Sequence, residues 1–507
     1  MIAIEITNRI NTPLNRTIRN TMNPIIETNL GKIRGIQKEE YQEFLGIRYA
    51  KSPTENLRYK EPEPVDSWED VYDATDFGPI AYQQWVDNPS IDMEESEDCL
   101  FLNVCTPQAD GEKRPVMVYI HGGGFGIGSG SRPRLHGHRL VTRGNIVLVT
   151  IQYRLSMLGF LSMDNIPPNL GILDQICALK WVRNNIANFG GDPENITIFG
   201  QSAGASSVLF LLTQPKAEGL FHKAISQSGV LLSSSPTETN DELSREILSK
   251  LKVEYGNLDA LQKLPIEKLT QVMKKLGDMM SGKMLTPIQE GDLYTQLEEG
   301  FSKDVPLLMG YTSDEMPIFQ KILPSLGKAK GFLGRQFIKR NLSKITSNGS
   351  TAPLAEFHKN RLKDTGAPKD AEYDYVILDT MFRIPTIKIA ETRSKFEVGT
   401  FIYEFEYEAP NIQAAIHVLD LFFVFGTIDT ADISKEMQLA QSTDEQRLSE
   451  IMMDAWSNFA RTGNPSITEI QWPEFNMENY EAMILNVTPR VKKEYLKNER
   501  SFWSEIS

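Results

Sequence analysis

Short apolar runs recur along the middle of the chain, separated by turns or by helical patterns. The runs that we expect to be strands are 100–104, 116–120, 146–153, 196–199, 223–228, 305–310 and 400–407. Apolar residues follow one another almost without interruption in the first four, which is typical of strands buried on both faces. The pattern therefore predicts an α/β fold with a large, mostly parallel central sheet and helices on both faces.

Apolar residues at helical spacing predict the elements between these strands. Five of them between Ile172 and Ile186 form one stripe, and N-F-G-G-D-P at 188–193 predicts the end of that helix. A second long helix is predicted at 444–460, near the C-terminus. The first of these is expected to be a crossover helix packed against the sheet.

Outside the sheet, the pattern predicts short strands and turns at 26–60 and two helical excursions. Residues 234–300 are mostly helical in pattern and charged, and residues 318–370 are rich in Lys, Gly and Pro. Both excursions are expected as cap insertions. Because no internal repeat, low-complexity tract or Gly/Ser linker interrupts the chain, we expect residues 1–507 to form a single domain.

A strand, a sharp turn and a helix meet at I-T-I-F-G-Q-S-A-G, residues 196–204. A β-branched run leads to G-x-S-x-G, and small residues then lead into an apolar helical segment. The two glycines allow the strand and helix backbones to approach where a Cβ would clash, and the strained serine is pushed clear of the sheet. In this context the motif predicts a nucleophile elbow with Ser202 as the nucleophile.

A serine hydroxyl needs a base, and six histidines are candidates: His121, His136, His138, His222, His358 and His417. In an α/β-hydrolase arrangement the chain order is serine, acid, histidine, so only those after Ser202 qualify. His222 leaves no room for an acid, and His358 lies among charges on a predicted solvated helix. His417, which precedes a large apolar run, is the predicted base.

The acid that orients the base is expected at the end of a strand between Ser202 and His417. In V-P-L-L-M-G-Y-T-S-D-E, an apolar strand and a glycine precede Asp314 and Glu315. Either carboxylate fits the role, and an adjacent acidic pair after a strand is also common in turns and helix caps. The residues alone leave the choice between Asp314 and Glu315 open.

Three consecutive glycines, 122–124, follow the predicted strand at 116–120 and His121. Without side chains, their backbone N–H groups can converge on the oxyanion of a tetrahedral intermediate, together with the N–H of Ala203. The alternative is a phosphate-binding loop. It is disfavoured because neither G-K-S/T nor a suitably placed acid follows.

The net charge and the cysteine content limit the classes of partner and the cellular compartment that we expect. The chain has 53 Lys and Arg against 67 Asp and Glu, a net charge of −14, without a sustained basic run. This argues against a nucleic acid or an anionic membrane as partner. Three cysteines without C-x-x-C spacing suggest neither a disulfide framework nor a zinc site, and no cofactor is expected. Because the sequence also lacks a signal-peptide pattern and a long apolar window, we expect a cytoplasmic protein with no membrane span.

With these parts in order, residues 28–475 resemble the type-B carboxylesterase and cholinesterase family of the α/β-hydrolase fold. The motifs that carry the resemblance are F-L-G-I-R-Y-A at 44–50, S-E-D-C-L-F-L-N-V at 96–104, H-G-G-G-F at 121–125, Q-Y-R-L at 152–155, N-L-G-I-L-D-Q at 169–175, N-F-G-G-D-P at 188–193, G-Q-S-A-G at 200–204, Q-S-G at 227–229, S-D-E at 313–315 and H-V-L-D-L-F-F-V-F-G at 417–426. So many long motifs in one order make the resemblance specific.

The resemblance implies a role for individual residues. By their positions in the motifs, it implies Ser202 as nucleophile, His417 as base and Glu315, rather than Asp314, as acid. It further implies an oxyanion hole made by Gly123, Gly124 and Ala203, with Ser228 as a supporting serine near the acid. The expected activity is two-step hydrolysis of a small-molecule ester through an acyl-enzyme.

Departures from the family pattern narrow the expected substrates. Cys99 has no upstream cysteine, and Tyr82 stands in the place of the partner that secreted animal members use, which supports a reducing compartment. Gln201 replaces a frequent glutamate beside the nucleophile, and the short loop from Tyr82 lacks the tryptophan that cholinesterases place against a quaternary ammonium. Uncharged esters are therefore expected.

The sequence leaves the roles of several other positions open. Trp85 is a candidate for the mouth of the gorge, and Arg48, which stands where a proline is usual, has no predicted effect. Candidates for the substrate pockets are Met279, Met280, Met284 and Phe382, although such residues are more often core. Alternative functions are a lipase or thioesterase on the same scaffold and a non-catalytic adhesion or binding module.

Overall fold

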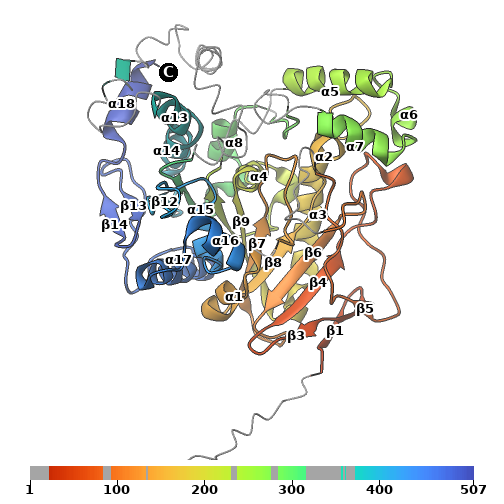
Figure 1. The fold of residues 1–507 in the computed structure, drawn as a ribbon, viewed down its shortest axis with the longest axis horizontal. Coiled ribbons are helices and arrows are strands. Elements are labelled where there is room, and N and C mark those ends of the chain that lie inside the picture. Colours follow the sequence, from red (N-terminus) through yellow and green to blue (C-terminus); the bar gives the residue numbers. More distant parts are fainter. Residues whose placement is uncertain are drawn as a thin grey trace, which may run out of the picture.

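The computed structural model describes residues 22–83, 93–132, 135–229, 237–275, 284–289, 291–315, 356–357, 360 and 371–506. An 11-stranded sheet runs through it in the order β14-β13-β12-β11-β10-β9-β7-β8-β6-β4-β3 (Figure 1). Its strands are β3 (Ile36–Gln37), β4 (Gln42–Arg48), β6 (Phe101–Thr106), β7 (Arg114–Ile120), β8 (Val147–Ile151), β9 (Gly191–Gln201), β10 (Lys223–Gln227), β11 (Leu307–Thr312), β12 (Thr400–Phe405), β13 (Ala482–Leu485) and β14 (Arg490–Lys492).

Neighbouring strands from β8 to β13 are parallel, whereas the pairs toward the two edges are antiparallel. The predicted large and mostly parallel sheet is confirmed, and so are its seven predicted strands, with shifted ends. The strand expected at 196–199 extends over all of β9, and the one expected at 146–153 is limited to β8. The predicted N-terminal strands include β1 (Ile25–Thr28) and β2 (Gly31–Arg34), which form a separate small sheet with β5 (Tyr72–Asp73).

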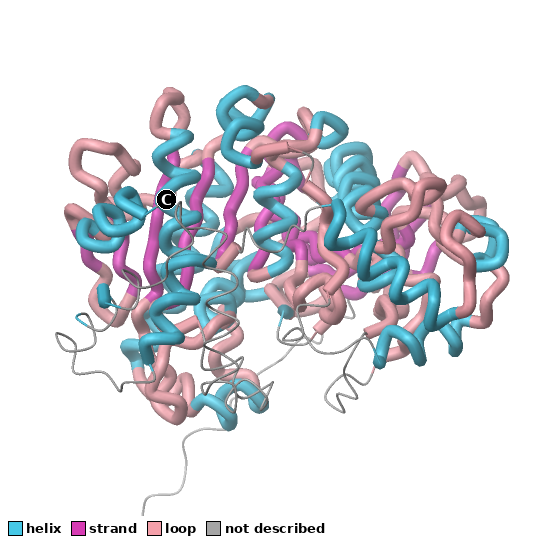
Figure 2. Tube along the Cα trace, turned by 90° about the horizontal axis from the view of Figure 1, so that it is seen from above, coloured by secondary structure: helices cyan, strands magenta, loops and turns pink. Residues whose placement is uncertain are grey.

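Successive residues of a strand face opposite sides of the sheet, and both sides are covered here. Along β7, Val116, Val118 and Ile120 belong to one buried cluster, whereas Met117 and Tyr119 belong to another. The first cluster includes residues of α3 (Leu170–Asn185), α4 (Ala203–Leu211), α5 (Thr237–Leu251), α7 (Ile266–Lys275), α8 (Leu293–Glu299) and α14 (Ile384–Arg393). The second includes residues of α1 (His138–Gly144), α15 (Leu419–Phe425) and α17 (Thr443–Thr462). Figure 2 shows the strands passing between helices, as predicted from their apolar character.

The predicted crossover and C-terminal helices are present as α3 and α17. The crossover helix continues as a 3-10 turn, Ile186–Phe189, and the chain then turns at Gly190, whose φ is 81°. A left-handed glycine is the usual way to end a helix, as N-F-G-G-D-P predicts. α17 begins at a capping box formed by Ser442 and Glu445.

The predicted excursion at 234–300 is mostly helical in its described residues, although 284–289 form no helix. It contains α5 (Thr237–Leu251), α6 (Leu258–Gln262), α7 (Ile266–Lys275) and α8 (Leu293–Glu299), and Figure 1 shows α5 to α7 grouped on one side of the sheet. The second predicted excursion, 318–370, lies outside the described residues except for 356–357 and 360. The other helices in the described residues are α2 (Ser156–Phe160), α13 (Ala371–Leu378), α14 (Ile384–Arg393), α16 (Ala431–Met437) and α18 (Lys497–Ile506), with a π-helical turn at Asp379–Arg383 and 3-10 turns at Glu55–Leu57, Pro215–Ala217 and Phe301–Asp304.

The sequence pattern did not predict several elements, among them α1, α13, α14, α16, α18, β13 and β14. The helices α13 and α14 join through the π-helical turn, and most of the side chains in α14 are buried, so no polar face marks it as amphipathic. The strands β13 and β14 are short, and all three residues of β14 are exposed. Among the described residues, no helix is both long and apolar enough to cross a membrane.

Candidate active site

The predicted elbow lies between β9 and α4. β9 ends at Gln201, α4 begins at Ala203, and Ser202 between them has φ 58° and ψ −124°, a backbone conformation that costs a non-glycine residue energy. A Cβ on Gly200 would lie 2.4 Å from the backbone of Gly204. A Cβ on Gly204 would lie 2.0 Å from the carbonyl oxygen of Ile120 on β7. Both glycines are therefore required by close backbone contacts, one across the elbow and one with the neighbouring strand.

The structure brings Glu315 and His417 together although they are 102 residues apart in the chain. Glu315 follows β11, and His417 precedes α15. One carboxylate oxygen, Oε2, contacts His417 Nδ1. The other, Oε1, accepts hydrogen bonds from Ser228 Oγ at 2.7 Å and from the backbone N–H of Thr312 at 2.9 Å. Glu315 is only 1% exposed, so its carboxylate is shielded from water. Its position is fixed by these three partners.

Asp314, the other candidate acid, has different partners. Its Oδ2 accepts hydrogen bonds from Ser313 Oγ at 3.1 Å and from the backbone N–H of Ala415 at 3.2 Å. Its own backbone N–H donates to the carbonyl of Ala415 at 3.1 Å. Asp314 thus holds the segment that leads to His417, whereas Glu315 contacts the imidazole itself.

A contact with the side chain of Gln201 places the base, His417, beside the elbow. Gln201 Nε2 lies 3.0 Å from Nε2 of His417, and both residues are buried. Since Glu315 contacts Nδ1, we assign the ring proton to Nδ1, and Nε2 then accepts a hydrogen bond from the Gln201 amide. The nitrogen that would take a serine proton is thus directed toward the residue that precedes Ser202.

The glycine loop lies directly against the elbow. A Cβ on Gly122 would lie 2.5 Å from the carbonyl oxygen of Gln201 and 3.1 Å from Cβ of Ser202. Gly123 and Gly124 have φ values of 118° and 60°, in the left-handed region that favours glycine. The loop is therefore composed of glycines because of both its conformation and its contact with the nucleophile turn.

Buried side chains hold the glycine loop in place. Gln83, which is 2% exposed, accepts a hydrogen bond from the N–H of Gly128 at 2.6 Å and donates to its carbonyl at 3.2 Å. His121 stacks on Tyr153, with ring centroids 4.4 Å apart, and its Nδ1 donates to the carbonyl of Gly122 at 2.9 Å. Burial lowers the pKa of His121 to about 3, so this histidine is neutral and supports the loop.

A second buried carboxyl group, on Asp420, lies in the first turn of α15, three residues after His417. Its Oδ2 accepts hydrogen bonds from Gln227 Nε2 at 2.9 Å and from the Tyr403 hydroxyl at 2.7 Å. Trp456 Nε1 donates to Gln227 Oε1 at 3.2 Å, and the carbonyl of Gln227 accepts from the N–H of Ser202 at 2.9 Å. Burial raises the pKa of Asp420. Sequence reasoning missed this network; an acid in the apolar run H-V-L-D-L-F-F was the available signal.

The other predicted candidates lie elsewhere or outside the described residues. His222 Nδ1 accepts the backbone N–H of Ile196 at 3.1 Å. Phe382 is buried with its ring 5.9 Å from that of His417, and Met284 is half-buried. His358, Trp85, Met279 and Met280 lie outside the described residues.

Arg48 and the cysteines have clear structural surroundings. Arg48 forms a bidentate ion pair with Asp98, at 2.5 and 2.7 Å, and its guanidinium lies 4.4 Å from the centre of the Phe101 ring. The arginine therefore ties β4 to the segment that precedes β6. Cys99, Cys105 and Cys177 are free thiols.

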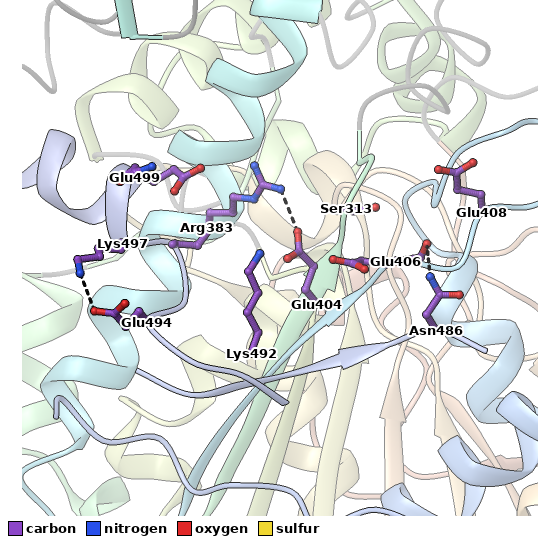
Figure 3. Close-up of a pocket in the computed structure, with 12 residues that line it drawn as sticks. Ser313, Arg383, Glu404, Glu406, Glu408, Asn486, Lys492, Glu494, Lys497 and Glu499 are labelled. Atoms are coloured by element: carbon purple, nitrogen blue, oxygen red, sulfur yellow. Dashed lines mark hydrogen bonds and ion pairs between the residues drawn. The ribbon is translucent and has the colours of Figure 1, made fainter. Parts of the chain in front are cut away.

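A charged pocket of about 580 Å³ lies near the C-terminal ends of β11 and β12 (Figure 3). Three of its five carboxylates form short polar contacts: Glu404 with Arg383 at 2.9 Å and Tyr495 at 2.8 Å, Glu406 with Arg490 at 2.6 Å, and Glu494 with Lys497 at 2.6 Å. Ser313 reaches its wall, but none of the residues predicted to carry ester chemistry lines it. Its charge suits structural ion pairing better than an apolar ester.

Known proteins resemble this chain along nearly its whole length. The model of the carboxylesterase family matches residues 22–503. Para-nitrobenzyl esterase of Bacillus subtilis is 34% identical over 485 residues, covering 91% of this chain and 94% of that protein. Carboxylesterase 1C of Mus musculus is 33% identical over 530 residues, covering 95% and 93%. The crystal structure of the Geobacillus stearothermophilus carboxylesterase EST55 at pH 6.2 superposes with a TM-score of 0.84 at 34% identity, covering 94% of this chain and 99% of that one. The chain therefore belongs to the carboxylesterase family and is a serine carboxylic ester hydrolase with the α/β-hydrolase fold.

Proposed function

We propose that this carboxylesterase hydrolyses uncharged carboxylic esters with Ser202 as nucleophile, His417 as general base and Glu315 as the carboxylate that orients His417. The observation that carries the assignment is the buried contact between Glu315 and His417 Nδ1 beside the elbow. A carboxylate on Nδ1 keeps the proton there and leaves Nε2 as the basic nitrogen. It also stabilises the imidazolium that forms when Nε2 accepts a proton.

In the first half of the reaction, His417 Nε2 takes the proton of Ser202 as Oγ bonds to the ester carbonyl carbon. The tetrahedral intermediate then collapses, the bond from carbon to the alkoxy oxygen breaks, and His417 protonates the departing alcohol. In the second half, water gives a proton to His417 Nε2 as its oxygen bonds to the acyl carbon. The bond from that carbon to Oγ then breaks, His417 returns the proton to Oγ, and the carboxylic acid leaves with Ser202 restored. The reaction balances with water as the only other reactant.

The oxyanion is assigned to the amides of Gly123, Gly124 and Ala203. Within the described residues, the N–H groups of Gly123 and Gly124 donate to no backbone carbonyl. Ala203 is the first residue of α4, where backbone N–H groups have no partner within the helix and the helix dipole favours negative charge. These amides are fixed before the reaction starts, which is the condition for effective electrostatic stabilisation.

Labelling of the wild-type protein tests the proposed nucleophile. A fluorophosphonate should inactivate the esterase with a stoichiometry of one, and mass spectrometry of the digested protein should place the adduct on Ser202. An adduct on another serine would contradict the assignment. The same preparation, assayed with p-nitrophenyl esters of increasing acyl length, with a thioester and with an emulsified triglyceride, distinguishes an esterase of soluble esters from a lipase or thioesterase.

Gln201 supports the preference for uncharged esters because it places a neutral amide, and no carboxylate, next to the base. Replacing Gln201 by Glu should favour the protonated imidazole, since a negative charge then faces Nε2. The acid limb of the pH profile of kcat/KM for p-nitrophenyl butyrate should move to higher pH by about one unit. Hydrolysis of a cationic choline ester should improve relative to the neutral ester.

A matched Gln201→Met variant removes the amide without adding charge and has a similar volume. It should leave the ratio of cationic to neutral ester hydrolysis near the wild-type value. Identical pH profiles and identical substrate ratios in the glutamate variant and the wild type would show that residue 201 does not face the base.

The cytoplasmic location and the single-domain organisation stay predictions.

A further inference from the structure

Two hydrogen bonds meet at one oxygen of a carboxyl group that lies just after the proposed base. Asp420, which is fully buried in the first turn of α15, accepts at Oδ2 from Gln227 Nε2 at 2.9 Å and from the Tyr403 hydroxyl at 2.7 Å. Its other oxygen, Oδ1, has no hydrogen-bond partner among the described residues. Both donors are buried, so the loss of this acceptor would leave them unsatisfied, and the contact is held firmly.

Gln227 is the last residue of β10, and its main chain supports the other two members of the proposed triad. Its carbonyl oxygen accepts the N–H of Ser202 at 2.9 Å. Ser228, which follows it, donates its hydroxyl to Glu315 at 2.7 Å. Trp456 Nε1 donates to the side-chain Oε1 of Gln227 at 3.2 Å, which directs the NH₂ end of the amide toward α15. The side chain of Gln227 is therefore held at both ends, while its backbone supports the nucleophile turn and leads to the serine that holds the acid.

The proposed base lies in a segment that needs support on both sides. His417 is in a turn, and Val418, which follows it, has φ 79°. A β-branched residue rarely adopts this left-handed conformation, which persists only where surrounding contacts enforce it. Before the turn, Asp314 and Ala415 hold each other by two hydrogen bonds, at 3.1 and 3.2 Å. After the turn, Asp420 anchors the start of α15 to β10 and β12.

We propose that Asp420 and Gln227 are positioning residues of the ester reaction, and that the hydrogen bond between them fixes the base relative to the nucleophile and the acid. This role rests on the proposed function. The bond joins the helix that follows His417 to the strand end that supports Ser202 and Glu315. Loss of the bond would let the imidazole shift, and the rate of the chemical step depends steeply on such geometry.

Asp420 serves as a hydrogen-bond acceptor, and this role does not require a charge. Burial raises its pKa, which favours the neutral acid. Asparagine has the same shape and can place its carbonyl oxygen where Oδ2 lies, with its NH₂ group in the place of Oδ1. Leucine has a similar volume but no acceptor. Asp420→Asn should therefore preserve the positioning, and Asp420→Leu should remove it.

Steady-state kinetics with p-nitrophenyl butyrate test the role of the bond. Gln227→Met breaks it, so kcat should fall by about thirtyfold while KM stays within about twofold of the wild-type value. Tyr403→Phe and Trp456→Phe are the matched controls, because each removes one neighbouring buried hydrogen bond and leaves the bond from Gln227 to Asp420 in place. Both controls should lower the unfolding temperature but keep kcat within about threefold of wild type.

The variants of Asp420 give a second comparison. Asp420→Leu should lower kcat as Gln227→Met does, whereas Asp420→Asn should stay within about threefold of wild type. The rate of inactivation by a fluorophosphonate should fall in parallel with kcat, because it reports the first nucleophilic step alone.

Two outcomes would overturn the positioning role. One is a loss of kcat in Gln227→Met no larger than that in Tyr403→Phe and Trp456→Phe. The other is an Asp420→Asn variant as impaired as Asp420→Leu. A fully active Ser202→Ala variant would instead overturn the proposed function, so the two failures are distinguishable.

Discussion

Ser202→Ala should lower kcat for p-nitrophenyl butyrate by about six orders of magnitude and abolish labelling by a fluorophosphonate. The loss follows because no other atom can form the acyl-enzyme, while the oxyanion amides and the binding surface leave only a small residual rate. Folding should be nearly unaffected, since Ser202 is only partly buried and alanine removes one oxygen atom. Stopped-flow or overnight assays, together with intact-protein mass spectrometry after labelling, measure both effects.

Ser206→Ala is the matched control for the nucleophile. Ser206 lies one turn further along α4, is also partly buried, and donates its hydroxyl to the carbonyl of Ser202 at 3.2 Å. Its removal should keep most of the activity and all of the labelling. Substantial turnover by Ser202→Ala, or labelling that survives in it, would refute the assignment of the nucleophile.

The second large effect is expected from Glu315→Gln, which should lower kcat by about four orders of magnitude. The amide carries no charge to stabilise the imidazolium, and its NH₂ group can turn the imidazole to the tautomer that has its proton on Nε2. His417 can then no longer accept the proton of Ser202. KM should change much less than kcat, because Glu315 is buried behind the histidine and away from the substrate.

Asp314→Asn separates this effect from a general loss of structure. Asp314 is adjacent in sequence, and its partners are Ser313 and the backbone of Ala415, which an asparagine oxygen can still engage. The variant should retain activity within about tenfold of wild type and unfold at a similar temperature. If Asp314→Asn lost as much activity as Glu315→Gln, the carboxylate that serves His417 would be wrongly assigned.

The parts of the site that the sequence predicts best are those made by short-range backbone geometry. Gly200 and Gly204 lie in contact across one turn, and the glycines at 122–124 have conformations that other residues avoid. Such requirements place glycines at fixed spacing in the sequence, because a side chain at these positions would clash whatever the rest of the chain does. The central strands are equally visible, since burial on both faces makes them continuously apolar.

Elements at the margin of the sheet and inside the helical layers are harder to predict. β14 has three exposed residues and lies at the edge of the sheet, where it pairs with β13. α14 is buried over most of its surface, which removes the polar face that would reveal its period. In both cases the tertiary surroundings, and not the local pattern, determine the structure.

By itself, the sequence of this esterase determined the α/β architecture, the elbow at Ser202 and the glycine loop, because each depends on residues that are close together in the chain. The residues alone left Asp314 and Glu315 equivalent and the family resemblance implied Glu315, whereas the tertiary structure shows the contact between Glu315 and His417 directly. It also decided that Gln227, Tyr403, Asp420 and Trp456 join beneath the site. Two adjacent carboxylates look alike in sequence, and only the packing of distant segments determines which one turns inward and which partners meet it.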